Sequence, residues 1–173
     1  MAITPDELPA YLQAIYDRVE AAAVPVAQKV GNAYKEHLVG FTLRESGEHT
    51  APTHTPSEPG RPPAFMTGHL SETVHQVPAF GVGPGVARTS VAPHTDYAAT
   101  IQWGQTHVGR PGKGMWLWLD RPYTPYQVKA RNLVKEEVVI PSYPYMNVAV
   151  DETIANGALE RAGEEAFTAA VWG

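Results

Sequence analysis

The stretch that decides the fold begins with Pro62-Pro63-Ala64-Phe65-Met66-Thr67-Gly68-His69-Leu70-Ser71-Glu72-Thr73-Val74 and ends with Asp96-Tyr97-Ala98-Ala99-Thr100-Ile101-Gln102-Trp103-Gly104. In the first segment a proline pair leads to Thr67, which suits the N-cap of a short helix through about Thr73. In the second segment residues 97–103 are typical of another short helix, and Gly104 is expected to end it. Both segments therefore predict a turn followed by a brief helix.

Between these segments the sequence predicts a β-hairpin. Residues 74–82 alternate loosely between apolar and polar side chains, residues 86–92 suit a second strand, and the turn sequence Gly81-Val82-Gly83-Pro84-Gly85 joins them. Pro78 has no backbone N–H to donate, so it is expected to mark an edge strand or a bulge.

Long helices are expected at both ends of the chain. Thr4 and Glu7 have the spacing of a capping box, and Pro25 predicts a kink or a break near residues 21–24. Gly40 is expected to close this helix ahead of a short strand at residues 41–43, and residues 147–171 form the predicted C-terminal helix. The apolar positions of the first helix predict one face that covers the core or is shared with a neighbouring subunit: Leu8, Tyr11, Leu12, Ile15, Val19, Ala22, Val26, Val30, Ala33, Tyr34 and Leu38.

The whole chain has 16 prolines and 15 glycines, so loops are expected over much of it. Residues 46–63 lack any large apolar side chain, so they are expected to be a mobile loop or an arm that a partner orders. Residues 105–114 are expected to be a polar loop, 115–119 and 137–141 short strands, and 142–146 an aromatic corner. The prediction is a single α+β domain over residues 1–173, with a small antiparallel sheet and short helices between two long helices.

Composition limits the classes of function. The chain has 173 residues, a net charge of −5 and no cysteine, which excludes disulfides, thiol nucleophiles and cysteine-ligated zinc. It lacks the basic stripe of a sequence-reading DNA-binding protein, and no stretch approaches about 18 continuous apolar residues. We therefore expect a soluble, unexported protein that touches nucleic acid only passively and contacts no membrane.

Catalytic and metal sites have little support in the sequence. Residues 109–115 depart from a phosphate loop because glycine follows Lys113 where Ser or Thr is needed, and no Gly-x-Ser-x-Gly elbow occurs. We expect no catalytic residue, no metal ligand and no cofactor. The alternative from another class is a small metal-dependent hydrolase that uses the scattered histidines, which share no ligand spacing: His49, His54, His69, His75, His94 and His107.

Aromatic residues are the remaining signal. They suit either the core or an assembly surface, because Trp and Tyr are enriched in protein interfaces. The set comprises Tyr97, Trp103, Trp116, Trp118, Tyr123, Tyr126, Tyr143 and Tyr145. Possible assembly contacts among them are Trp116, Trp118, Tyr143 and Tyr145.

The order of these motifs resembles the tail-completion, or head-to-tail connector, proteins of long-tailed bacteriophages. In that family a helix precedes a Pro-Pro-x-x-x-Thr-Gly-x-Leu turn, a Tyr-Ala segment ending in glycine follows a hairpin, and a corner leads into a last helix. Here Trp103 stands where an acidic residue is usual, and the corner at residues 142–146 lacks the family's arginine. The positions that carry the motifs are Pro62, Pro63, Thr67, Gly68, Leu70, Tyr97, Ala98, Trp103 and Gly104.

The resemblance implies a structural protein of the virion and not an enzyme. Its expected role is to assemble as a homo-oligomeric ring in the neck, made in the host cytoplasm, and to join the head to the tail. Its partners would be further copies of itself, other neck and tail-tube proteins, and DNA that passes through the lumen without sequence-specific binding. A tail terminator or a stopper ring of the same neck is the alternative within this class.

Overall fold

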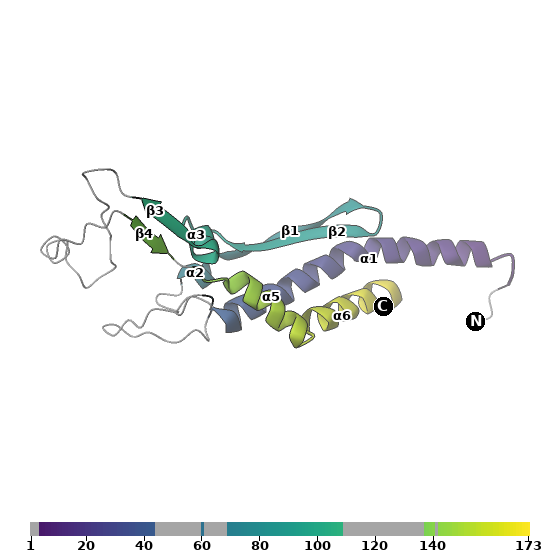
Figure 1. The fold of residues 1–173 in the computed structure, drawn as a ribbon. Helices are drawn as coiled ribbons and strands as arrows, with labels where there is room; N and C mark the ends of the chain where they lie inside the picture. Colours follow the sequence, from purple (N-terminus) through teal and green to yellow (C-terminus); the bar gives the residue numbers. More distant parts are fainter. Residues whose placement is uncertain (1–3, 44–59, 61–68, 109–136, 141) are drawn as a thin grey trace, which may run out of the picture.

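A computed structural model describes residues 4–43, 60, 69–108, 137–140 and 142–173. It confirms the predicted α+β class, with a long N-terminal helix, small antiparallel sheets, short helices and a helical C-terminus (Figure 1). The arm predicted at residues 46–63 and the strand predicted at 115–119 lie outside the described residues. The elements are α1 (Leu8–His37), a π-helical turn η1 (Leu38–Thr42), α2 (His69–Glu72), β1 (Val74–Gly83), β2 (Val86–Pro93), α3 (Ala98–Trp103), β3 (Gln105–Val108), β4 (Glu137–Ile140), α5 (Tyr145–Ala155) and α6 (Ala158–Trp172).

Helix α1 is the central layer of the molecule. Its 30 residues span about 45 Å at the standard rise of an α-helix. The β1–β2 hairpin lies along one side of α1 and α6 along the other, and the first turns of α1 extend beyond both (Figure 1). In the turn before the helix the Glu7 carboxylate accepts hydrogen bonds from the Thr4 amide (3.0 Å) and hydroxyl (2.7 Å). The first of these is one half of the predicted capping box, but Thr4 as the N-cap is wrong, because Glu7 occupies that position and α1 has no side-chain cap.

The break predicted near Pro25 is wrong, because α1 continues through this residue without interruption. A proline inside a helix removes one backbone hydrogen bond and costs about 3 kcal/mol or more. Pro25 is exposed, while the neighbouring Ala22 and Gly31 are buried. Packing against the hairpin and α6 on either side therefore offsets the local cost.

The end of α1 also differs from the prediction. The strand expected at residues 41–43 is wrong, and Gly40 does not stop the helix, which widens into the π-helical turn η1. The Leu43 amide donates to the Leu38 carbonyl at 3.0 Å, which is the i to i+5 bond of a π-helix. This wider turn brings Leu38 and Leu43 together, and both are buried.

The predicted hairpin is confirmed. Strands β1 and β2 pair in antiparallel register, with a shift between Val77 and Phe80 that confirms the irregularity expected at Pro78. Gly85 has a φ of 63°, which favours glycine in the tight turn. The hairpin lies so close to α1 that a Cβ at Gly31 would overlap the side chain of Gln76.

A second strand pair corrects the loop predicted at residues 105–114 over residues 105–108, and residues 109–114 lie outside the described residues. Strand β3 pairs antiparallel with β4, from Gln105 opposite Ile140 to Val108 opposite Glu137. The strand expected at residues 137–141 is thereby confirmed over β4. The pairing joins positions about 30 residues apart, which a local sequence pattern does not reveal.

The C-terminal helix is divided in two. Helix α5 ends at Ala155 and α6 begins at Ala158, because Gly157 adopts a left-handed conformation with φ of 67°. The Asn156 side chain then accepts a hydrogen bond from the Ala158 amide at 2.9 Å. The direction of the chain changes here, so α6 packs along α1.

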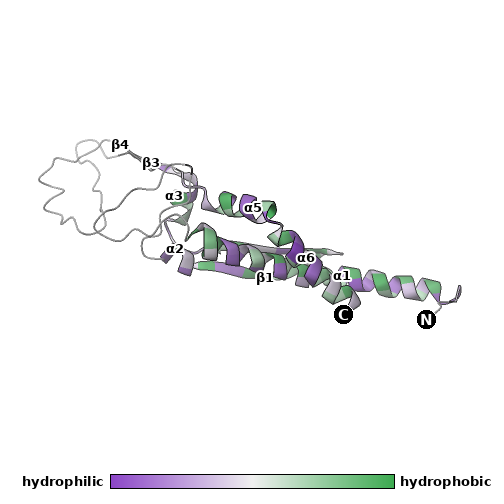
Figure 2. Cartoon of the chain, turned by 90° about the horizontal axis from the view of Figure 1, so that it is seen from below, coloured by the Kyte–Doolittle hydropathy of each residue, from purple (hydrophilic) through white to green (hydrophobic). Residues whose placement is uncertain are grey.

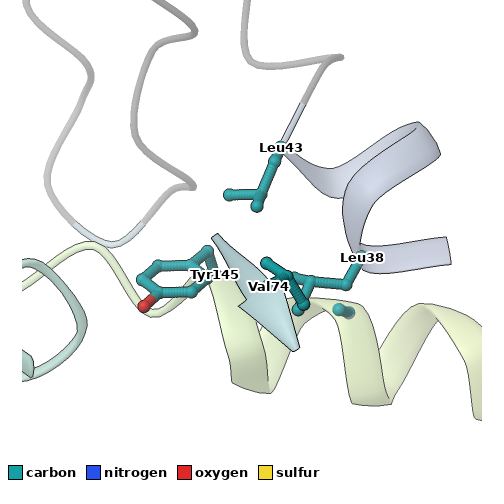
Figure 3. Close-up of a cluster of buried hydrophobic side chains, with 5 residues drawn as sticks. Leu38, Leu43, Val74 and Tyr145 are labelled. Atoms are coloured by element: carbon teal, nitrogen blue, oxygen red, sulfur yellow. The ribbon is translucent and has the colours of Figure 1, made fainter. Parts of the chain in front are cut away.

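The core lies where the end of α1, the base of the hairpin and the start of α5 meet (Figure 3). Tyr145 and Leu38 are its largest fully buried side chains. A second contact joins α1 and α6, where Ala22 and Ala162 are buried and a Cβ at Gly163 would lie at an ordinary 3.5 Å from Val30. The core members are Leu38, Leu43, Val74, Tyr145 and Ala149.

Candidate assembly surface

The motif segment at residues 96–104 and the corner at residues 142–146 meet at the junction between α3 and α5. Gln102 is 2% exposed, and its side-chain carbonyl accepts a hydrogen bond from the Met146 amide at 3.0 Å while its amide group donates to Asn147 at 3.1 Å. The Tyr143 amide donates to the Ile101 carbonyl at 2.8 Å. Met146 is in the first turn of α5, where backbone amides have no partner within the helix. Gln102 therefore caps α5 from a different element.

Tyr145 is part of the core and not of a surface. It is 1% exposed, and its hydroxyl donates to the Ala98 carbonyl at 3.4 Å. Burial raises the pKa of Tyr145, and also that of Tyr34, to about 12. The assignment of Tyr145 to an assembly contact is therefore wrong. Tyr143 is half-buried at the junction.

The remaining motif residues occupy different environments. Ala98 is buried, Leu70 packs against the core, and Gly104 ends α3 with a φ of 73°. Tyr97 is 40% exposed and Trp103 is 70% exposed. Pro62, Pro63, Thr67, Gly68, Trp116 and Trp118 lie outside the described residues.

Within the described part of the chain, no group of three or more histidine and acidic side chains could hold a metal ion. His75 and His94 form a ring contact with centroids 5.1 Å apart. The Glu152 carboxylate faces His37 Nε2 at 2.9 Å and accepts the Thr42 hydroxyl at 2.7 Å, which ties α5 to the end of α1. These are structural contacts between elements. His49 and His54 lie outside the described residues.

The first turns of α1, whose hydropathy Figure 2 shows, carry an apolar stripe in which Ile15 is half-buried and the other members are between 41% and 55% exposed. Leu12 is 55% exposed and Leu8 is 46% exposed. The members recur at the three- and four-residue spacing of one helix face. We call this surface the α1 stripe, and it comprises Leu8, Tyr11, Leu12, Ile15 and Val19.

The α1 stripe continues the face that α6 covers further along α1. Ala22 is 1% exposed, and Val30 on the same face packs near Gly163 of α6. Near the end of α6, the Arg18 guanidinium of α1 donates to the Val171 carbonyl at 3.5 Å. Helix α6 then ends, so the stripe loses its cover.

The hairpin has a second exposed apolar surface on the side that faces away from α1. Towards α1, Gln76 donates to the Gln28 carbonyl at 3.1 Å, and the Gln28 side chain accepts the Ala79 amide at 2.8 Å. On the side away from α1, four large apolar side chains of the hairpin are between 45% and 54% exposed. We call this surface the hairpin face, and it comprises Val77, Phe80, Val82 and Val86.

The periodicity of the first helix predicts that its whole apolar face is covered or shared, and it does not separate the two halves of that face. Element lengths offer the signal that separates them. Helix α1 has 30 residues, twice the 15 residues of α6. Strand β1 has 10 residues and is about 33 Å long, whereas α1 is about 45 Å long. One end of α1 must therefore project.

No protein-family model matches this chain, and neither the curated proteins nor the solved structures contain a significant match to it. None of the described helices is both long and apolar enough to cross a membrane.

Proposed function

We propose that this protein is a structural subunit of the bacteriophage neck, a tail-completion protein that assembles as a ring between head and tail. One observation carries the proposal, namely the α1 stripe on a helix end that projects beyond its own fold. Large contiguous apolar surfaces on a soluble chain mark sites of protein association. A subunit that is complete only beside another subunit fits a ring.

The order of sequence motifs supports the same role. The hairpin lies between the Leu70 segment and the Tyr97-Ala98 segment, and the corner before Tyr145 leads into the last helices. These elements appear in the order expected for the neck family. The net charge of −5 suits a passage for DNA, because repulsion from phosphates keeps the strand from adhering.

Deletion of the gene from a phage that carries it tests the proposal. The expected result is DNA-filled heads and separate tails that fail to join, with joining restored by the wild-type gene in trans. Mass spectrometry of purified wild-type particles should detect the protein, and labelling should locate it at the head-to-tail junction. Normal particles after deletion, or purified particles without the protein, would refute the proposal. The labelled position also separates tail completion from a tail terminator or a stopper ring.

A further inference from the structure

The α1 stripe and the hairpin face lie on opposite sides of the molecule. Along α1, Gln28 and Gly31 face the hairpin, whereas Val30 faces α6. The stripe shares the face of α1 that carries Val30, on the side of α6, whereas the hairpin lies along the other side of α1 (Figure 1). The hairpin face is the surface of the hairpin that is turned away from α1. A contact between them cannot form within one chain, but it can form between two copies.

We infer that the α1 stripe of one copy packs against the hairpin face of the next copy, which deepens the proposed ring function and rests on it. Such a contact joins two different surfaces in a head-to-tail manner. Repeated from copy to copy, it generates a closed ring when the rotation between copies closes. A two-fold contact between identical stripes would instead stop at a dimer.

The two surfaces agree in length. From Leu8 to Val19 the stripe extends about 16 Å along a helix. From Val77 to Val82 the hairpin face extends about 17 Å along a strand. Each surface can therefore cover the apolar side chains of the other over its whole length.

Charge favours the hairpin over the exposed apolar side chains of α5 and α6, which include Val150, Ile154 and Trp172. Residues 4–20 contain four carboxylates and one arginine, so the projecting end of α1 is acidic. Residues 145–172 are acidic too, with five carboxylates and one arginine, and would repel it. The hairpin, residues 74–93, has Arg88 as its only formally charged residue, and Arg88 is exposed.

The absence of cysteine allows a direct test by site-specific cross-linking. The double variant Leu12→Cys/Phe80→Cys should give a ladder of covalent oligomers with a short bifunctional maleimide. Each single-cysteine variant should remain uncross-linked. In the matched control Ala10→Cys/Phe80→Cys, the thiol at residue 10 lies on the side of α1 opposite to the α1 stripe, so this variant should give no ladder. A covalent dimer from Leu12→Cys alone would show stripe-to-stripe packing and overturn the inference.

Association should weaken when either surface receives a charge. Leu12→Glu and Phe80→Glu should each raise the dissociation constant of self-association at least about tenfold, and the control Ala10→Glu should leave it within about twofold. Both wild-type side chains are at least half exposed, so circular dichroism should show an unchanged fold. A protein that stays monomeric, or that assembles with no effect of either variant, would overturn the contact. Neither result touches the neck role, which the particle composition decides separately.

Discussion

Replacing Gln102 by leucine tests how α3 is joined to the start of α5. Leucine has nearly the same size, so the change removes two hydrogen bonds without opening a large cavity. The part-buried Met146 amide, which donates a hydrogen bond to the Gln102 side chain at 3.0 Å, would lose its partner. A buried donor without a partner costs about 1–3 kcal/mol. Asn147 is exposed and can turn to water, so it adds little.

We therefore expect Gln102→Leu to lower the free energy of unfolding by about 2 kcal/mol. For a domain of this size that corresponds to a decrease in melting temperature of about 4–8 °C. Urea unfolding followed by circular dichroism should show a lower midpoint with an unchanged slope, since the area exposed on unfolding stays the same.

The matched control is Gln105→Leu, three residues further along. Gln105 is exposed, and the hydrogen bond that its side chain accepts from Thr100 at 2.9 Å is exposed as well. This variant should stay within about 0.5 kcal/mol of the wild type. Equal losses in the two variants, or a loss below about 0.5 kcal/mol in Gln102→Leu, would refute the view that a cap supplied by α3 stabilises α5.

Two further predictions concern glycine and tyrosine. Gly31→Ala should destabilise the fold by about 1–3 kcal/mol, because the new methyl group overlaps the side chain of Gln76. Gly163→Ala should stabilise the fold by about 0.5–1 kcal/mol, because this position has room for a methyl group. Melting temperatures of the two variants that shift in the same direction would contradict this pair of predictions. Burial raises the pKa of Tyr34 and Tyr145 from 10.0 to about 12, so the fold favours their neutral forms and loses this stability as pH rises from about 10 to 12. The double variant Tyr34→Phe/Tyr145→Phe should flatten the loss of stability over that range in urea titrations, and an unchanged slope would count against burial as the cause.

Local signals predicted the local structure. The glycine-rich turn at residues 81–85 placed the hairpin, and Pro78 placed its irregularity, because both act within a few residues of chain. The division at Gly157 was missed although Asn156-Gly157 is a recognisable helix end. The continuity of α1 at Pro25 and its π-helical end depend on packing against distant elements, which no local pattern contains.

The candidate surface was harder to predict than the fold. The periodicity of α1 shows that one face needs cover, but it does not say which element supplies it. Tyr145 and Tyr143 illustrate the same limit, because both are aromatic corner residues and only one is in the core. The resemblance to phage neck proteins rests on the order of the sequence motifs. The contacts with other subunits and with DNA stay predictions.

The projecting end of α1 has a consequence for the order of events in assembly. About 12 residues are too few to hold an isolated helix in water, so this end depends on the rest of α1 for its order. Its backbone amides should exchange with deuterium far faster than those near Ala22, which is buried. When a neighbouring copy covers this end of α1, the exchange rates of its amides and of those near Ala22 should converge. The projecting end is therefore the last part of each subunit to become rigid, and it becomes rigid only after the neighbouring subunit has bound.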